Sequence, residues 1–233
     1  MEKIRPNQDR AKVAVIMVII ASASGVLVLI SNILQLTLLQ SAQSGSNVTQ
    51  QDIAMNDIRV YAVGIIYLLA HIVSGIFFIR WFRRAYFNLH LVAKSLTHSE
   101  GWAAGAWFVP ILNLFRPYEI MKELYQETDI YLSKKKVSPK VNLSTNVVSL
   151  WWTLYVISLL AERFINYRSN KETDLAGLIN LGKIQLASDL LIIPLAFVTI
   201  KVIKDYSKVE PLLEIENKDK NTMIFPQSEE LLV

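Results

Sequence analysis

The sequence contains no cysteine, which excludes disulfides, thiolate nucleophiles and zinc sites built on cysteine. Only three histidines are present, at positions 71, 90 and 98, and they are too scattered to predict a metal site. Glycine is also scarce, with eight residues, and the chain has no phosphate-cradling glycine loop, no Gly-x-Ser-x-Gly and no His-Glu-x-x-His. We therefore predict no catalytic residues, no metal and no cofactor.

Charged residues are also scarce in this sequence. Charged side chains make up 19% of the chain and hydrophobic ones 52%, whereas about a quarter of an ordinary soluble domain is charged. The net charge is only +4, and the basic residues cluster at the ends of apolar blocks rather than on one continuous face. This distribution favours a role in membrane orientation and argues against nucleic-acid binding.

The sequence does contain long apolar blocks. Four of them are long enough to cross a bilayer as helices. The first has a basic leader and an Ala-Ser-Ala triplet at residues 21–23, as a signal peptide would have. Its apolar run continues well past that triplet, so a retained helix is the better interpretation. We predict an all-α membrane four-helix bundle with spans at residues 13–39, 60–79, 147–164 and 184–203.

A fifth block, residues 101–115, is short for a crossing, because fifteen residues of helix reach only about 22 Å. If this block does not cross and the amino terminus is cytoplasmic, 19 of the 24 basic residues lie inside. If it crosses, the basic residues divide equally between the two sides. The positive-inside rule therefore favours four crossings, with residues 101–115 re-entrant or interfacial.

The remaining segments complete the predicted organisation. Residues 1–12 form a cytoplasmic amino-terminal segment and residues 13–204 the membrane domain. Residues 117–133 place apolar side chains on one face and are expected to form an amphipathic surface helix. Residues 205–233 are polar, mixed in charge and interrupted by Pro211 and Pro226, which predicts a disordered cytoplasmic tail.

Several strings in and around the short block together resemble a known pattern. They are Trp102, Trp107-Phe108-Val109-Pro110-Ile111-Leu112-Asn113-Leu114-Phe115-Arg116-Pro117-Tyr118, Met121, Glu123-Leu124, Arg84-Ala85-Tyr86-Phe87-Asn88-Leu89 and Trp151-Trp152. With these residues the chain is similar, over roughly residues 55–205, to a bacterial membrane family catalogued as domain of unknown function 4328. That resemblance implies a multi-pass protein of the bacterial cytoplasmic (inner) membrane, and it implies no established activity.

The densest polar collection lies beside the short block. In one interpretation its arginines bind an anion or a lipid headgroup. In the other, these side chains form a structural network that satisfies backbone groups exposed by the re-entrant segment. The residues concerned are Arg84, Asn88, Asn113, Arg116, Tyr118 and Glu123.

Two ionisable residues fall inside predicted spans. His71 shares a helix face with Gly64 and Gly75, which favours a close helix contact bridged by the imidazole over a proton-relay role. Asp189 lies about one turn into the last span. Pairing with Lys183, Lys171 or Arg168, or exposure to interfacial water, is the main interpretation, and an ion pathway is the alternative.

As function, the sequence favours a non-enzymatic bundle that interacts with proteins or lipids. A subunit of a small transporter or channel is the first alternative, and a lipid-modifying membrane enzyme is the second. The expected partners are the lipid bilayer, anionic lipids in particular, and a second copy or another membrane protein.

Overall fold

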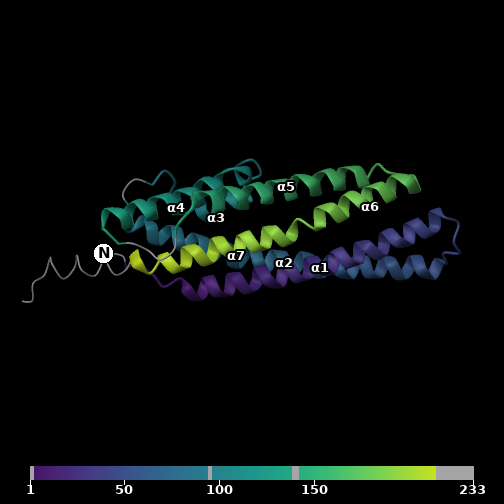
Figure 1. The fold of residues 1–233 in the computed structure, drawn as a ribbon, viewed down its shortest axis with the longest axis horizontal. Helices are drawn as coiled ribbons and strands as arrows, with labels where there is room; N and C mark the ends of the chain where they lie inside the picture. The colour runs from purple at the N-terminus through teal and green to yellow at the C-terminus, as the bar shows by residue number, and fades with distance from the viewer. Residues whose placement is uncertain (1–2, 94–95, 138–141, 214–233) are drawn as a thin grey trace, which may run out of the picture. The chain divides into compact units, whose positions relative to one another are not determined.

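The computed structural model describes residues 3–93, 96–137 and 142–213, and this part of the chain is helical without any β-strand. Figure 1 labels the helices along the chain. The longest, α2, alone has 41 residues. The elements are α1 (Gln8–Gln43), α2 (Gln50–His90), α3 (Trp102–Gly105), η1 (Ala106–Phe108), η2 (Leu112–Leu114), α4 (Arg116–Lys134), α5 (Thr145–Ser169), α6 (Leu175–Asp189) and α7 (Ile192–Val209), where η marks a 3-10 helix.

The chain forms two compact units, each built from stretches that are distant in sequence. Unit 1 comprises Met1–Lys12, Phe78–Ser149 and Val202–Val233. Unit 2 comprises Val13–Phe77 and Leu150–Lys201. The predicted all-α architecture is confirmed, and four helical stretches in the described residues are long and apolar enough to cross a membrane.

Unit 2 exposes the side chains that a water-soluble protein would bury. Ile65 is 58% exposed and Leu68 57%, and many other isoleucines and leucines of α1, α2 and α5 are about half exposed. A continuous apolar surface of this kind is expected where lipid, rather than water, surrounds the helices. The chain is therefore a membrane protein.

Helix contacts inside unit 2 depend on small residues of α1 and α6. A Cβ added at Gly25 would lie 2.2 Å from the side chain of Ile192, and one at Gly182 would lie 3.2 Å from that of Leu36. Small residues let helix backbones approach closely in membranes. The break between α6 and α7, visible in Figure 1, precedes Pro194, which can neither donate a hydrogen bond to Leu190 nor avoid its carbonyl.

Unit 1 has a conventional buried core, rich in aromatic residues. Trp81 of α2 is fully buried, with its ring 5.5 Å from that of Phe78 and 6.3 Å from that of Tyr206. Tyr125 of α4 donates a hydrogen bond of 2.8 Å to the carbonyl of Val202. These contacts join α2, α4 and α7 into one core.

Helix α4 covers the predicted amphipathic segment with one extra residue at each end. Pro117 lies in its first turn, where the missing N–H is not needed. The apolar face, including Ile120, Met121 and Leu124, is completely buried within the protein. In unit 1 this face therefore packs against protein side chains, and the polar face is the one left outward.

Residues 101–115 form short pieces of helix rather than one continuous helix. Pro110 lies between η1 and η2, and Phe108 and Ile111 beside it are 77% and 73% exposed. Trp107 anchors the segment to α2, with an edge-on ring contact to Phe78 at 5.8 Å. The re-entrant or interfacial role of this segment remains a prediction.

The structure differs from the sequence expectation after residue 204. Helix α7 continues to Val209, and Tyr206, Glu210 and Leu213 are buried within unit 1. These side chains pack against α2 and α4. The polar composition of the whole segment after residue 204 gives no indication of this packing. Residues 214–233 of the predicted disordered tail lie outside the described part of the chain.

Candidate anion-binding pocket

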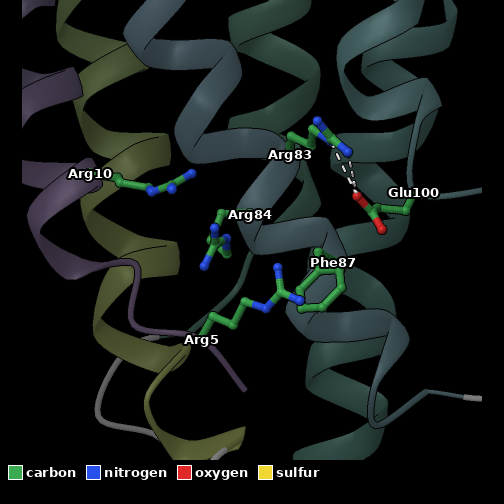
Figure 2. A pocket seen from close by; sticks show the side chains of 6 residues that line it. All are labelled: Arg5, Arg10, Arg83, Arg84, Phe87 and Glu100. Carbon is green, nitrogen blue, oxygen red and sulfur yellow. Dashed lines mark hydrogen bonds and ion pairs between the residues drawn. The ribbon is translucent and has the colours of Figure 1, made fainter. Parts of the chain in front are cut away.

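Four arginines of unit 1 surround a pocket of about 150 Å³. Helix α2 contributes Arg83 and Arg84 near its end, while Arg10 comes from the first turn of α1 and Arg5 from the segment before it. Figure 2 shows the side chains of Arg5, Arg10 and Arg84 near one another, whereas that of Arg83 is directed toward Glu100. Phe87 and Glu100 complete the lining.

Three of the four guanidinium groups are held by other residues, each in a different way. Arg83 donates from Nε and Nη2 to one oxygen of Glu100, at 3.2 and 3.0 Å. The Arg5 guanidinium lies 4.3 Å from the centre of the Phe87 ring, in a cation–π contact. Arg10 donates a hydrogen bond of 3.3 Å to the carbonyl of Arg80.

Arg84 is the exception among them. It makes no hydrogen bond or ion pair with another residue in the described part of the chain, and it is only partly exposed. Figure 2 shows its side chain between those of Arg10 and Arg5. Cations gathered this closely repel one another, and an anion placed among them would relieve that repulsion.

A buried carboxylate belongs to the same group of residues. Glu210, directly after α7, is 4% exposed and accepts a hydrogen bond of 2.7 Å from Nδ2 of Asn88. Asn7 Nδ2 lies 3.1 and 3.0 Å from its two oxygens. Burial raises the pKa of Glu210 to about 7, although the hydrogen bonds from Asn88 and Asn7 and the charge of Arg84 pull it down.

Asn88 connects this carboxylate to the pocket. Its Oδ1 accepts from the Arg5 backbone N–H at 3.0 Å, and its Nδ2 donates to the Arg5 carbonyl at 2.9 Å. The buried carboxamide of Asn88 therefore holds the backbone of a pocket arginine and the carboxylate of Glu210 at once.

The structure divides the six predicted site residues among several contacts. Arg84 lines the pocket and Asn88 lies next to it. Glu123 accepts from the Tyr86 hydroxyl at 2.5 Å and from the backbone N–H of Thr97 at 2.6 Å.

The other three also lie away from the pocket lining. Arg116 donates to Nδ1 of His98 at 2.8 Å, which requires that nitrogen to be unprotonated. The Tyr118 hydroxyl lies 3.0 Å from that of Ser149. Asn113 Oδ1 is buried and accepts no hydrogen bond from the described residues.

All the lining residues other than Arg84, three of them arginines, were missed as site residues by the sequence reasoning, as was Glu210. It used Arg5, Arg10 and Arg83 only as orientation charges, and it assigned Glu210 to the tail. The signal available was the basic pair Arg83-Arg84 one turn before Phe87 and Asn88, which places cations and their supporting residues on adjacent turns of one helix.

The intramembrane pair of predicted residues lies in unit 2. His71 Nδ1 is 3.0 Å from the carbonyl of Tyr67, one turn earlier. A Cβ added at Gly64 or Gly75 would meet nothing within 4 Å, so no described segment uses that face for a close helix contact.

Asp189 binds carboxamides rather than the expected lysines or arginine. It accepts from Asn32 Nδ2 at 2.7 Å and from Gln185 Nε2 at 2.8 Å. Gln185 Nε2 also lies 3.2 Å from an oxygen of Glu162, so one amide bridges two carboxylates. No cluster of His, Asp and Glu side chains able to hold a metal occurs in residues 3–93, 96–137 and 142–213.

One known protein family matches most of the chain. The family model described as "Domain of unknown function (DUF4328)" matches residues 44–208, well over half of the sequence. The chain belongs to this family. The matched range includes Arg83, Arg84 and Glu100 of the pocket, whereas Arg5 and Arg10 lie before it and Glu210 after it. No curated protein and no solved structure matches the chain.

Proposed function

We propose that this chain is a non-enzymatic, four-span protein of the bacterial cytoplasmic membrane that binds the headgroup of an anionic phospholipid in its arginine pocket. Both described ends of the chain face the cytoplasm in this proposal. The observation that carries it is the convergence of four arginines on one pocket, in which Arg84 makes no hydrogen bond or ion pair with any described residue.

The chemistry of the lining suits a phosphate-bearing group. A guanidinium presents a planar set of N–H donors that matches two phosphate oxygens, and it stays charged at any physiological pH. Glu100 forms an ion pair with only one of the four arginines, Arg83. The remaining cations favour an anion over a zwitterionic headgroup, whose own positive charge they would repel.

The membrane setting makes phospholipid the favoured source of that group. The exposed isoleucines and leucines of unit 2 keep the chain among phospholipids. Basic residues beside a membrane are attracted to anionic lipid of the cytoplasmic leaflet. In the topology preferred by charge counting, all four pocket arginines lie on that side.

Binding of labelled phosphatidylglycerol to the purified full chain in neutral detergent micelles tests the proposal. Arg84→Ala should weaken binding about tenfold to a hundredfold, since a charge-assisted hydrogen bond contributes about 1.5–3 kcal/mol. Arg84 makes no hydrogen bond or ion pair with a described residue, so its truncation should leave the fold intact. Arg84→Lys should recover only part of the affinity, because a lysine keeps the charge and loses the planar donor set.

Lys134→Ala is the matched control, because it removes one exposed positive charge from the same unit outside the pocket. It should leave the affinity unchanged. Equal losses in Arg84→Ala and Lys134→Ala, or equal binding of phosphatidylglycerol and phosphatidylcholine, would show that no specific headgroup site exists.

A further inference from the structure

A single buried carboxylate holds together three segments of unit 1 that are far apart in sequence. Glu210 accepts hydrogen bonds from Asn7, before α1, and from Asn88, near the end of α2. Both asparagines are themselves buried. Burying a carboxylate that has only amide hydrogen-bond donors is unfavourable, so another interaction must compensate for the cost of burial.

The arginine pocket provides this interaction, because Asn88 and Arg84 contact or act on both Glu210 and the pocket. Asn88 binds the carboxylate with one Nδ2 hydrogen and the Arg5 carbonyl with the other. Arg84 acts electrostatically on Glu210 and is also a pocket residue. An anion bound beside Arg84 would offset the positive field that now favours the ionised carboxylate.

The protonated form of Glu210 has a hydrogen-bond acceptor at hand. Asn7 Oδ1 is buried and has no hydrogen-bond partner among the described residues. Turning the Asn7 carboxamide by half a turn would put this oxygen where Nδ2 now lies, 3.0 Å from Glu210 Oε2. The turn gives up the bond of 3.2 Å from Nδ2 to the Trp81 carbonyl and provides an acceptor for a carboxylic acid proton.

We infer that Glu210 takes up a proton when the arginine pocket takes up an anion, so that each binding event strengthens the other. This inference rests on the proposed function, since it concerns regulation of the same pocket. It follows from linkage, because two groups that disfavour each other's negative charge must show reciprocal effects on affinity and on protonation.

The direction in which a bound anion shifts the pKa of Glu210 follows from the groups that face this carboxylate. Arg84 of α2 favours the charged form, whereas Tyr206 on its own helix contributes no positive charge, and Asn7, Asn88 and the Arg5 backbone are neutral. The pKa of Glu210 without an anion is about 7, and a bound anion raises it further. Proton uptake is therefore expected near neutral pH, and affinity for the anion should rise as the pH falls from 8 to 6.

Two measurements on the unmodified protein test this coupling. Affinity for phosphatidylglycerol should be about three- to tenfold higher at pH 6 than at pH 8, for a coupling of ordinary size. The phosphodiester headgroup does not titrate in this range, so the change must come from the protein. Adding the lipid to the protein in weakly buffered neutral micelles should also remove protons from solution, as a pH-sensitive dye reports. No proton uptake would overturn the inference without any variant.

Glu210→Gln and Glu100→Gln form a matched pair that separates proton coupling from simple charge. Each removes one negative charge close to the pocket arginines, and each should strengthen binding at pH 8. Only Glu210→Gln should abolish the pH dependence and the proton uptake, because only Glu210 is buried at the Asn7–Asn88 contact. Retention of both effects in Glu210→Gln would refute the role of this residue.

The outcomes also separate this inference from the proposed function. If Arg84→Ala leaves phosphatidylglycerol binding unchanged, the proposed headgroup site is refuted, and the inferred proton coupling is refuted with it. If Arg84→Ala weakens binding while Glu210→Gln behaves like Glu100→Gln, the site stands and only the coupling is refuted.

Discussion

Helix α2 carries large apolar side chains through two different environments. Trp81 and Phe82 in unit 1 are completely buried by other parts of the chain, whereas Ile65 and Leu68 in unit 2 are more than half exposed. The sequence is apolar in both stretches. The difference lies in what covers these side chains, since protein packs against the first pair and lipid is expected to surround the second.

The polar contacts of the two units differ in the same way. In unit 1, Glu210 accepts from two buried asparagines within reach of Arg84. In unit 2, Asp189 and Glu162 share the amide of Gln185, and Asn32 is the further donor to Asp189. Unit 1 thus places a carboxylate beside cations that a ligand can reach, whereas the unit 2 network holds helices together by neutral amides.

Truncating one large side chain in each unit gives the largest expected contrast. Trp81→Ala should lower the free energy of unfolding by about 3–5 kcal/mol, because it leaves a cavity in a core that cannot collapse freely. Leu68→Ala should change it by less than about 1 kcal/mol, since the side chain contacts few protein atoms. Chemical denaturation in detergent micelles measures both. Equal losses would contradict the distinction between the two environments.

Replacing one asparagine in each polar network should give a smaller contrast. Asn88→Ala removes three hydrogen bonds, two part-buried and one buried, and leaves Glu210 with fewer donors, which should cost about 2–3 kcal/mol. Asn32→Ala removes one bond to Asp189 and should cost about 0.6 kcal/mol, the average for such bonds between membrane helices. The same denaturation measurement applies, and a larger loss for Asn32→Ala would reverse the comparison.

The pH dependence of stability should give the smallest effect. The folded-state pKa of Glu210 is about 7, above the ordinary value of 4.5, so the folded protein keeps a proton that the unfolded chain releases. The stability contributed by this group is therefore complete below pH 4.5 and is lost as the pH rises through 7. Glu210→Gln should be about 1–2 kcal/mol more stable than the unmodified protein at pH 8 and nearly equal to it at pH 5.

Much of the helical architecture could be predicted from the sequence because it depends on local patterns. The block at residues 13–39 lies within α1, and the predicted amphipathic segment 117–133 differs from α4 by one residue at each end. Apolar length and helical periodicity are properties of neighbouring residues. The dense polar collection beside the short apolar block also indicated Arg84 and Asn88, which lie one turn apart, as candidate site residues.

The pocket could not be assembled from the sequence because its parts are distant along the chain. Asn7 and Glu210 are separated by 203 positions, and Asn88 and Glu210 by 122. No periodicity links such residues. Glu210 was further hidden by its polar surroundings, although Tyr206, Val209 and Leu213 recur at helical spacing and are buried.

The span between Asn7 and Glu210 also sets an order for biosynthesis. The segment before α1 leaves the ribosome long before its partner exists, so unit 1 cannot close until residue 210 has been translated. The apolar helices can enter the bilayer one after another in the meantime. Closure of the carboxylate contact therefore follows synthesis of the apolar helices, and until then the arginines of the segment before α1 and of α2 lack the fixed positions that they have in unit 1.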